Sequence, residues 1–256
     1  MIRIYNEDCL RTIERLDDAS IDCVVTSPPY GGKIHNGYFT AQGNRLYDIH
    51  DDSVDVDKYN SLCRELFTGL GRKLKRTGAV IWNVSYNKAN TEGFIRAIME
   101  ILDNTDFTIA DVACWKKPMA VTIDSPNRMT RICELVFIFV RRDGFEDYYC
   151  NKCLSSEKDG RKKWCAVFNF VEAKNNDGKQ DLNGATFSTE FAQHFLELYC
   201  RRGGVVYDPF MGTGTTASAA RNLGMDCIGS EISAAQCEYA KRRLDDMFTQ
   251  VEIIKK

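Results

Sequence analysis

Short apolar runs alternate with amphipathic segments along most of the chain. The apolar runs predict strands at Met1–Ile4, Ile21–Val25, Ala79–Val84, Phe107–Cys114, Leu135–Val140, Gly204–Tyr207 and Cys227–Gly229. Apolar residues at helical spacing predict helices at Tyr59–Leu74, Thr91–Leu102, Thr189–Cys200, Thr215–Leu223 and Ala234–Met247. Strands that alternate with helices are typical of α/β proteins. The pattern predicts a doubly wound sheet, and 256 residues are enough for a single domain over 1–256.

One segment, residues 145–183, interrupts this alternation. It is polar, rich in Lys, Asn, Asp and Gly, and holds a single short apolar run at Ala166–Val171. We therefore interpret it as an insertion within the domain.

Charge indicates a partner only when it is examined locally. The formal net charge of −2 and the pI near 6.0 do not by themselves indicate any class of partner. From residue 116 to residue 163, however, basic residues outnumber acidic ones, and aromatic residues lie among them. A solvated face of mixed charge would have the same composition. We prefer contacts with phosphates, and assign them to Lys116, Lys117, Arg161, Lys162 and Lys163.

The motif Ser27-Pro28-Pro29-Tyr30 directly follows a predicted strand. Methylation of an exocyclic amine on a nucleobase requires acceptors that hold the two amine hydrogens, because the nitrogen lone pair is delocalised into the ring. Ser27 offers an oxygen, and Pro28 offers a carbonyl without an N–H of its own. Tyr30 offers a flat face on which a base turned out of a duplex can stack. A plain Pro-Pro turn at a strand end is the alternative.

A glycine-rich turn follows the strand at 204–207 and leads into a predicted helix. Its residues Asp208, Pro209, Phe210, Gly212, Gly214 and Thr215 let the backbone approach a ligand, and a helix N-terminus favours an anionic group. The next strand ends at Glu231, a carboxylate that can accept both hydroxyls of a ribose. Nicotinamide dinucleotide and S-adenosylmethionine both suit this arrangement, and the Ser-Pro-Pro-Tyr motif favours S-adenosylmethionine.

These residues resemble the DNA amino-methyltransferases that modify N4 of cytosine or N6 of adenine. The order of motifs, with the Pro-Pro-aromatic loop first and the glycine-rich loop near the C-terminus, is similar to that of the β class of restriction–modification methyltransferases. The resemblance implies a Rossmann-like methyltransferase sheet and places target recognition in the insertion at 145–183. It also implies double-stranded DNA as substrate and a flipped target base. Ser at the first motif position is associated more with cytosine N4 than with adenine N6.

The resemblance also implies further contacts with the donor. Asn6-Glu7-Asp8-Cys9-Leu10 is similar to the segment in which an acid meets the donor adenine, which implies Asp8 and Cys9. Thr186 and Phe187 lie in a stretch similar to one that lines the donor site. The family usually has a His before this stretch and a Pro after its Phe, whereas this chain has Asn183 and Ser188. This departure makes the contacts at Thr186 and Phe187 the weaker ones.

The eleven cysteines carry no disulfide signal. Neither a signal peptide nor a membrane-spanning stretch is recognised, so we expect reduced thiols in a cytoplasmic protein with no membrane partner. Cys150 and Cys153 have the spacing of half a zinc site, but after Cys165 no nearby ligand completes it. We therefore predict no metal.

Several alternatives remain at this level. An RNA or protein amino-methyltransferase usually has the donor loop first, and a nicotinamide oxidoreductase has no use for residues 27–30. A non-catalytic DNA-binding module would not need both loops. A homodimer and a cognate restriction endonuclease are further partners that the resemblance implies.

Overall fold

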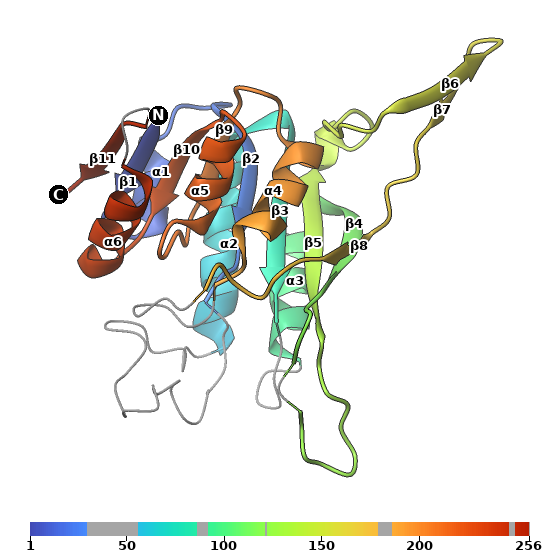
Figure 1. The fold of residues 1–256 in the computed structure, drawn as a ribbon. Coiled ribbons are helices and arrows are strands. Elements are labelled where there is room, and N and C mark those ends of the chain that lie inside the picture. Colours follow the sequence, from blue (N-terminus) through green and yellow to red (C-terminus); the bar gives the residue numbers. More distant parts are fainter. Residues whose placement is uncertain (30–55, 86–91, 121, 179–185, 246–248, 256) are drawn as a thin grey trace.

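The computed structural model describes residues 1–29, 56–85, 92–120, 122–178, 186–245 and 249–255. Within this part of the chain, a nine-stranded sheet forms the centre of the molecule (Figure 1). Its strands, in spatial order, are β11 (Val251–Ile254), β1 (Ile2–Tyr5), β10 (Asp226–Ser230), β9 (Val205–Asp208), β2 (Ile21–Thr26), β3 (Leu74–Val84), β5 (Cys133–Arg141), β4 (Phe107–Lys116) and β8 (Phe170–Glu172).

Helices cover both faces of the sheet, because its central strands are apolar on both sides. On β2, Val24 packs into the core under α1 (Cys9–Arg15), α2 (Val56–Lys73) and α3 (Gly93–Asn104). The next residue, Val25, packs into the core under α4 (Thr189–Tyr199), α5 (Thr215–Asn222) and α6 (Ala234–Leu244). Successive side chains of a strand point to opposite faces, so this strand is buried on both. The prediction of a doubly wound sheet is confirmed.

The direction of the strands defines two edges of the molecule. β5 runs antiparallel to β3 and β4, whereas the other pairings recorded in this sheet are parallel. The carboxyl ends of β1, β10, β9, β2, β3 and β4 therefore meet at one edge, together with the start of β5. We call it the carboxyl edge. Chain connections on opposite faces leave β2 and β9 side by side, which makes their carboxyl ends the switch point where ligands bind in such sheets.

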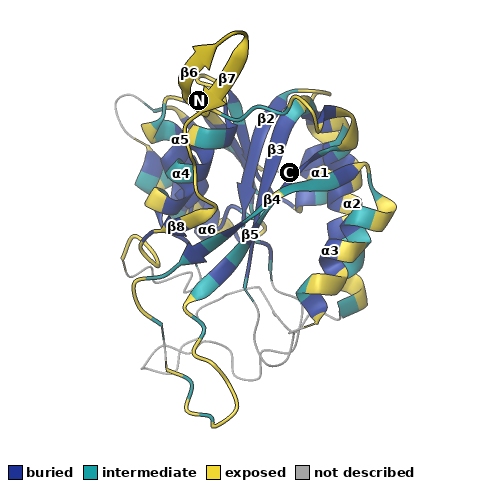
Figure 2. Ribbon diagram, turned by 90° about the vertical axis from the view of Figure 1, so that its right-hand side faces the viewer, coloured by how far each residue is buried: buried dark blue, intermediate teal, exposed yellow. Residues whose placement is uncertain are grey.

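The predicted insertion divides into two parts. After β5 and a short 3-10 helix, η1 (Arg142–Gly144), the chain forms the two-stranded arm β6 (Leu154–Lys158) and β7 (Arg161–Trp164). Figures 1 and 2 show that the arm projects from the end of the sheet opposite the carboxyl edge, with exposed residues on both strands. The chain then returns as β8, which pairs with β4.

The strands and helices predicted from apolar spacing are all present, with ends that differ by a few residues. The sequence pattern missed α1, the arm, β8 and β11, which are short or fully exposed. None of the helices in the described ranges is long and apolar enough to cross a membrane.

Candidate active site

The end of β2 is joined to the end of β9 by a buried carboxyl. Asp208, only 2% exposed, accepts a hydrogen bond from the Thr26 hydroxyl at 2.6 Å and one from the Phe210 backbone N–H at 3.0 Å. Burial raises the pKa of Asp208 to about 6, although hydrogen bonds from Thr216, Thr26 and Phe210 lower it. The predicted contact of Asp208 with the donor stays a prediction; its described hydrogen bonds tie the glycine-rich turn to the strand that precedes Ser27.

The glycine-rich turn is closely packed. Gly214 has φ of +83° at the start of α5, and a Cβ on it would lie 3.0 Å from the Cβ of Ala240. Pro209 and Gly212 are buried, and the ring of Phe210 packs edge-on against Trp82. Thr215 accepts a hydrogen bond from Arg243 at 3.3 Å. These contacts fix the path of the backbone before the helix begins.

Glu231 is held in place by the backbone on both sides of it. Its Oε2 accepts from Gly212 N at 2.9 Å, and its Oε1 accepts from Ser233 N at 2.7 Å. The carboxylate thus has a fixed orientation at the end of β10, beside the turn. A rigid acid in this position fits the ribose diol of a nucleoside donor.

The segment after β1 reaches the same edge. The Asp8 side chain caps α1 by accepting from Leu10 N at 2.8 Å, and Cys9 is buried beneath it. Sequence reasoning did not select Asn6, yet its amide donates to the carbonyl oxygens of Glu231 and Ile232 at 2.9 and 3.1 Å. This amide fixes the first segment beside the predicted ribose site.

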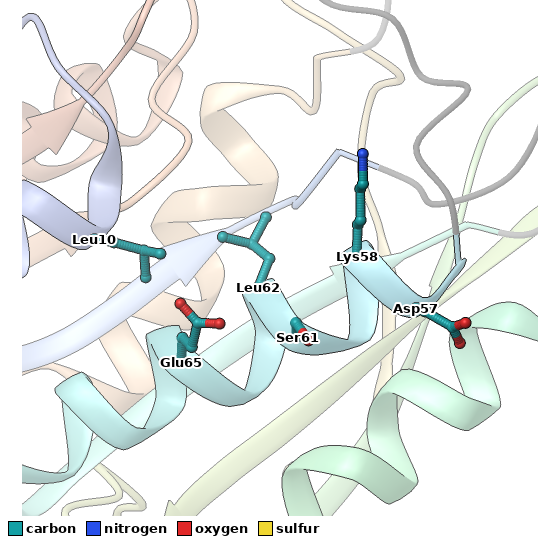
Figure 3. A pocket seen from close by; sticks show the side chains of 6 residues that line it. All are labelled: Leu10, Asp57, Lys58, Ser61, Leu62 and Glu65. Carbon is teal, nitrogen blue, oxygen red and sulfur yellow. The ribbon is translucent and has the colours of Figure 1, made fainter.

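A hollow of about 400 Å³ opens beside this first segment, between α1 and α2 (Figure 3). The residues that line it are Leu10, Asp57, Lys58, Ser61, Leu62 and Glu65. None of the predicted donor contacts belongs to this described lining. The hollow therefore lies next to the candidate site, on the side of α1, and is lined by other residues.

Ser27 and Pro28 stand at the switch point, directly after β2. Ser27 is half-buried and Pro28 buried, and Pro29 is the last described residue before the gap. Tyr30 lies outside the described residues. Thr26 and Trp82 are partners in the parallel pairing of β2 with β3, so Ser27 and Asn83 come next to each other at the carboxyl edge.

Asn83 belongs to a polar cluster that the sequence only partly predicted. Its amide nitrogen donates to Glu134 Oε2 at 2.8 Å, and Glu134 forms an ion pair with Lys117. Lys117 also lies over the ring of Trp115, at 4.8 Å from its centroid. Lys117 was predicted to contact phosphate, as was Lys116, which pairs with Glu172. Both lysines are thus engaged with carboxylates of the chain.

Phe187 lies on the same face as this cluster. Its ring is 5.1 Å from that of Phe191, which is 4.6 Å from Trp115. Thr186 is half-buried and precedes it directly. The two residues directly precede Ser188, the N-cap of α4, and their contact with the donor stays a prediction.

The remaining predicted residues lie away from this edge. Arg161, Lys162 and Lys163 are exposed on β7 of the projecting arm. Cys153 and Cys165 flank the arm, with Cys165 N donating to Cys153 O at 2.8 Å, and Cys150 is half-buried. Within the described ranges, no group of three or more His, Cys, Asp or Glu side chains is arranged to hold a metal ion.

Known proteins resemble the chain along most of its length. The family model N6_N4_Mtase, described as DNA methylase, matches residues 21–242. Type II methyltransferase M.HinfI of Haemophilus influenzae is 27% identical, covering 95% of this chain and 68% of that protein. Type II methyltransferase M.SmaI of Serratia marcescens is 26% identical, covering 94% of this chain and 90% of that protein.

Solved structures share the fold. The PvuII DNA methyltransferase, described as cytosine-N4-specific, superposes with a TM-score of 0.68 at 19% identity, over 96% of this chain and 87% of that one. TTHA0409 of Thermus thermophilus, solved with S-adenosyl-L-methionine, has a TM-score of 0.67 at 17% identity, over 100% of this chain and 98% of that one. These likenesses confirm the Rossmann-like sheet. Because the family match extends from β2 through the glycine-rich turn into α6, the chain belongs to the N6_N4_Mtase family of DNA methylases.

Proposed function

We propose that this protein is a site-specific DNA methyltransferase that modifies N4 of cytosine in a flipped base, with S-adenosylmethionine as the methyl donor. Membership of the DNA methylase family carries the coarser statement, a DNA amino-methyltransferase. One observation supports the assignment of the site. The hydrogen bond of 2.6 Å between Thr26 and Asp208 joins the Ser-Pro-Pro motif to the glycine-rich turn at the switch point of the sheet.

The proposed mechanism relies on binding and orientation. S-adenosylmethionine, when bound, supplies a methyl group attached to a positively charged sulfur. Ser27 and the carbonyl of Pro28 accept the two hydrogens of the target amine, which directs the nitrogen lone pair toward the donor side. Glu231 holds the ribose of the donor, and Tyr30 stacks on the flipped base. Fixing both reactants in this way makes the transfer effectively unimolecular, which supplies most of the rate.

The choice of cytosine depends on Ser27. In the family that the motif resembles, Ser at this position is associated more with cytosine N4, and Asp with adenine N6. The solved relative from the PvuII system is described as cytosine-N4-specific, although at 19% identity it supports the fold rather than the base. Adenine N6 is the alternative.

Product analysis tests this function. Purified protein is incubated with tritiated S-adenosylmethionine and genomic DNA, and the DNA is hydrolysed to identify the labelled nucleoside. We expect N4-methylcytosine, and sequencing of the methylated positions gives the recognition sequence. Ser27→Ala should lower turnover and leave donor affinity unchanged, because Ser27 acts on the nucleophile. Ser27→Asp should retain part of the activity, since a carboxylate still accepts the amine hydrogen. N6-methyladenine as product would establish the alternative.

We also propose a cognate restriction endonuclease and a second copy of the chain as partners. Type II methyltransferases are among the relatives, which supports a restriction–modification setting, and another relative is named an orphan methyltransferase. Resistance of the methylated DNA to an endonuclease encoded nearby tests the first partner. Sedimentation of the purified protein tests the second.

A further inference from the structure

The loop between β4 and β5, which the structure describes at residues 117–120 and 122–132, projects beyond the carboxyl edge. Figures 1 and 2 both show it on the side of the sheet opposite the arm. Its base is fixed: Lys117 N donates to Ile132 O at 2.9 Å, and Lys117 pairs with Glu134. A second contact comes from Asn175, whose amide donates to Met119 O at 3.2 Å. The loop is therefore anchored beside the candidate active site.

The loop presents unusual side chains to solvent. Met129 is 88% exposed and Met119 is 75% exposed, and Arg128 between them in sequence is exposed as well. Single exposed apolar residues are common on protein surfaces, so exposure alone indicates little. Their position is the informative feature, because the loop leaves the sheet from the edge that holds Ser27.

The two ends of the loop lie close enough to Ser27 for the loop to contact DNA around the target base. One strand, β3, separates β2 from β5, and β4 lies next to β5. Neighbouring strands are about 4.8 Å apart, so the two ends of the loop begin roughly 10 to 15 Å from Ser27. A base that leaves the stack through a groove moves by a comparable distance, since the major groove is about 8.5 Å deep. Met129 comes shortly before Cys133, the first residue of β5, so its side chain starts near this end of the loop and can face the gap that a flipped base leaves.

We propose that the described residues of this loop, 117–120 and 122–132, are a DNA-binding surface of this enzyme, with Met129 inserted into the base stack beside the flipped base and Arg128 on a neighbouring phosphate. The inference rests on the proposed function, because it assumes a duplex whose target base is extruded. Apolar side chains, Met among them, serve as such wedges in proteins that unstack DNA. Inserting Met129 lowers the cost of extrusion, whereas the chemistry at Ser27 does not depend on it.

Two DNA substrates separate these roles. One is a paired duplex with the sequence found in the genomic assay. The other is the same duplex with an abasic site opposite the target base, so that extrusion costs less. We expect Met129→Ala to lower the single-turnover rate of methyl transfer about tenfold on the paired duplex. A tenfold loss corresponds to part of the cost of unstacking a base, which is a few kcal/mol. Transfer to the abasic duplex should be nearly unchanged, and Met129→Leu should restore the rate.

Controls make the outcome specific. Met99, 48% exposed on α3, gives the matched variant Met99→Ala, which should behave as wild type on both substrates. Arg128→Gln should weaken binding of both duplexes and reduce the salt slope of log K by about one unit. If Met129→Ala loses the same rate on both duplexes, or loses none on the paired duplex, the proposal is overturned. The proposed function then still stands, provided that the wild-type protein methylates the duplexes. A wild-type protein that methylates neither duplex would overturn both.

Discussion

At the scale of single residues, burial makes the carboxyl group of Asp208 an unusually weak acid. Its pKa is raised from 3.8 to about 6. Between these two pH values, Asp208 therefore keeps its proton in the folded protein and loses it in the unfolded chain. The free energy of unfolding should therefore fall as pH rises from about 4 to about 6, by up to about 3 kcal/mol, and level off above that range. Asp208→Asn removes this contribution. Urea unfolding of both proteins at pH 4.5 and pH 7 measures it, and identical pH profiles would contradict the assignment.

Glu231 offers a second test at this scale. Glu231→Gln replaces one acceptor oxygen by a donor, which conflicts with the N–H of Gly212 or Ser233 and removes the charge that favours the ribose hydroxyls. We expect donor binding to weaken by roughly 1.5–3 kcal/mol, the scale of hydrogen bonds to charged groups. Calorimetric titration with S-adenosylmethionine measures the change. Glu238→Gln, an exposed carboxylate on α6, is the control, and unchanged affinity in a folded Glu231 variant would exclude this role.

At the scale of elements, sequence periodicity predicted the longer elements that bury a face and missed the exposed arm and short elements such as α1, although α1 buries Cys9 and Ile13. The helices and central strands carry apolar residues at regular spacing. The arm is exposed on both strands, so its sequence has no apolar period to detect. The polar cluster of Asn83, Glu134 and Lys117 could not be predicted either, because strand pairing brings together residues that are far apart in the chain. Ser27, the glycine-rich turn and Glu231 were predictable because each directly follows a strand.

The Lys117–Glu134 pair gives a prediction about these elements. Glu134 connects the end of β3 to the segment after β4, and its side chain is only 10% exposed, whereas that of Lys117 is 24% exposed. Lys117→Met should destabilise the protein by about 1–3 kcal/mol, less than for a fully buried pair because solvent screens part of the charge. Adding Glu134→Gln should recover part of this loss, since no buried charge then lacks its cation. Urea unfolding of the double-mutant cycle measures both, and a double variant less stable than Lys117→Met would contradict the reasoning.

At the scale of the whole molecule, basic groups lie at both ends of the sheet. The β4–β5 loop stands at the carboxyl edge and the arm at the opposite end (Figure 1). The longest strand, β3, has 11 residues. At about 3.3 Å per residue it spans roughly 36 Å, so one duplex can reach both ends only by following the strands. Whether the arm contacts DNA therefore decides how the duplex lies on the protein.

Replacement of Arg161, Lys162 and Lys163 by Gln tests the arm. Lys162 faces Glu157 across the arm, so part of its charge is already balanced, while Arg161 faces Lys158. If these residues neutralise phosphates, DNA binding should weaken on every sequence, and the slope of log K against log salt should flatten by about 0.9 for each lost contact. Donor affinity should not change, because the arm is far from Glu231. The control replaces the exposed Arg72, Arg202 and Arg242 by Gln, which removes the same charge from other elements. A slope that moves equally in both variants would reflect net charge alone, and a slope that does not move in the arm variant would restrict the duplex to the carboxyl edge.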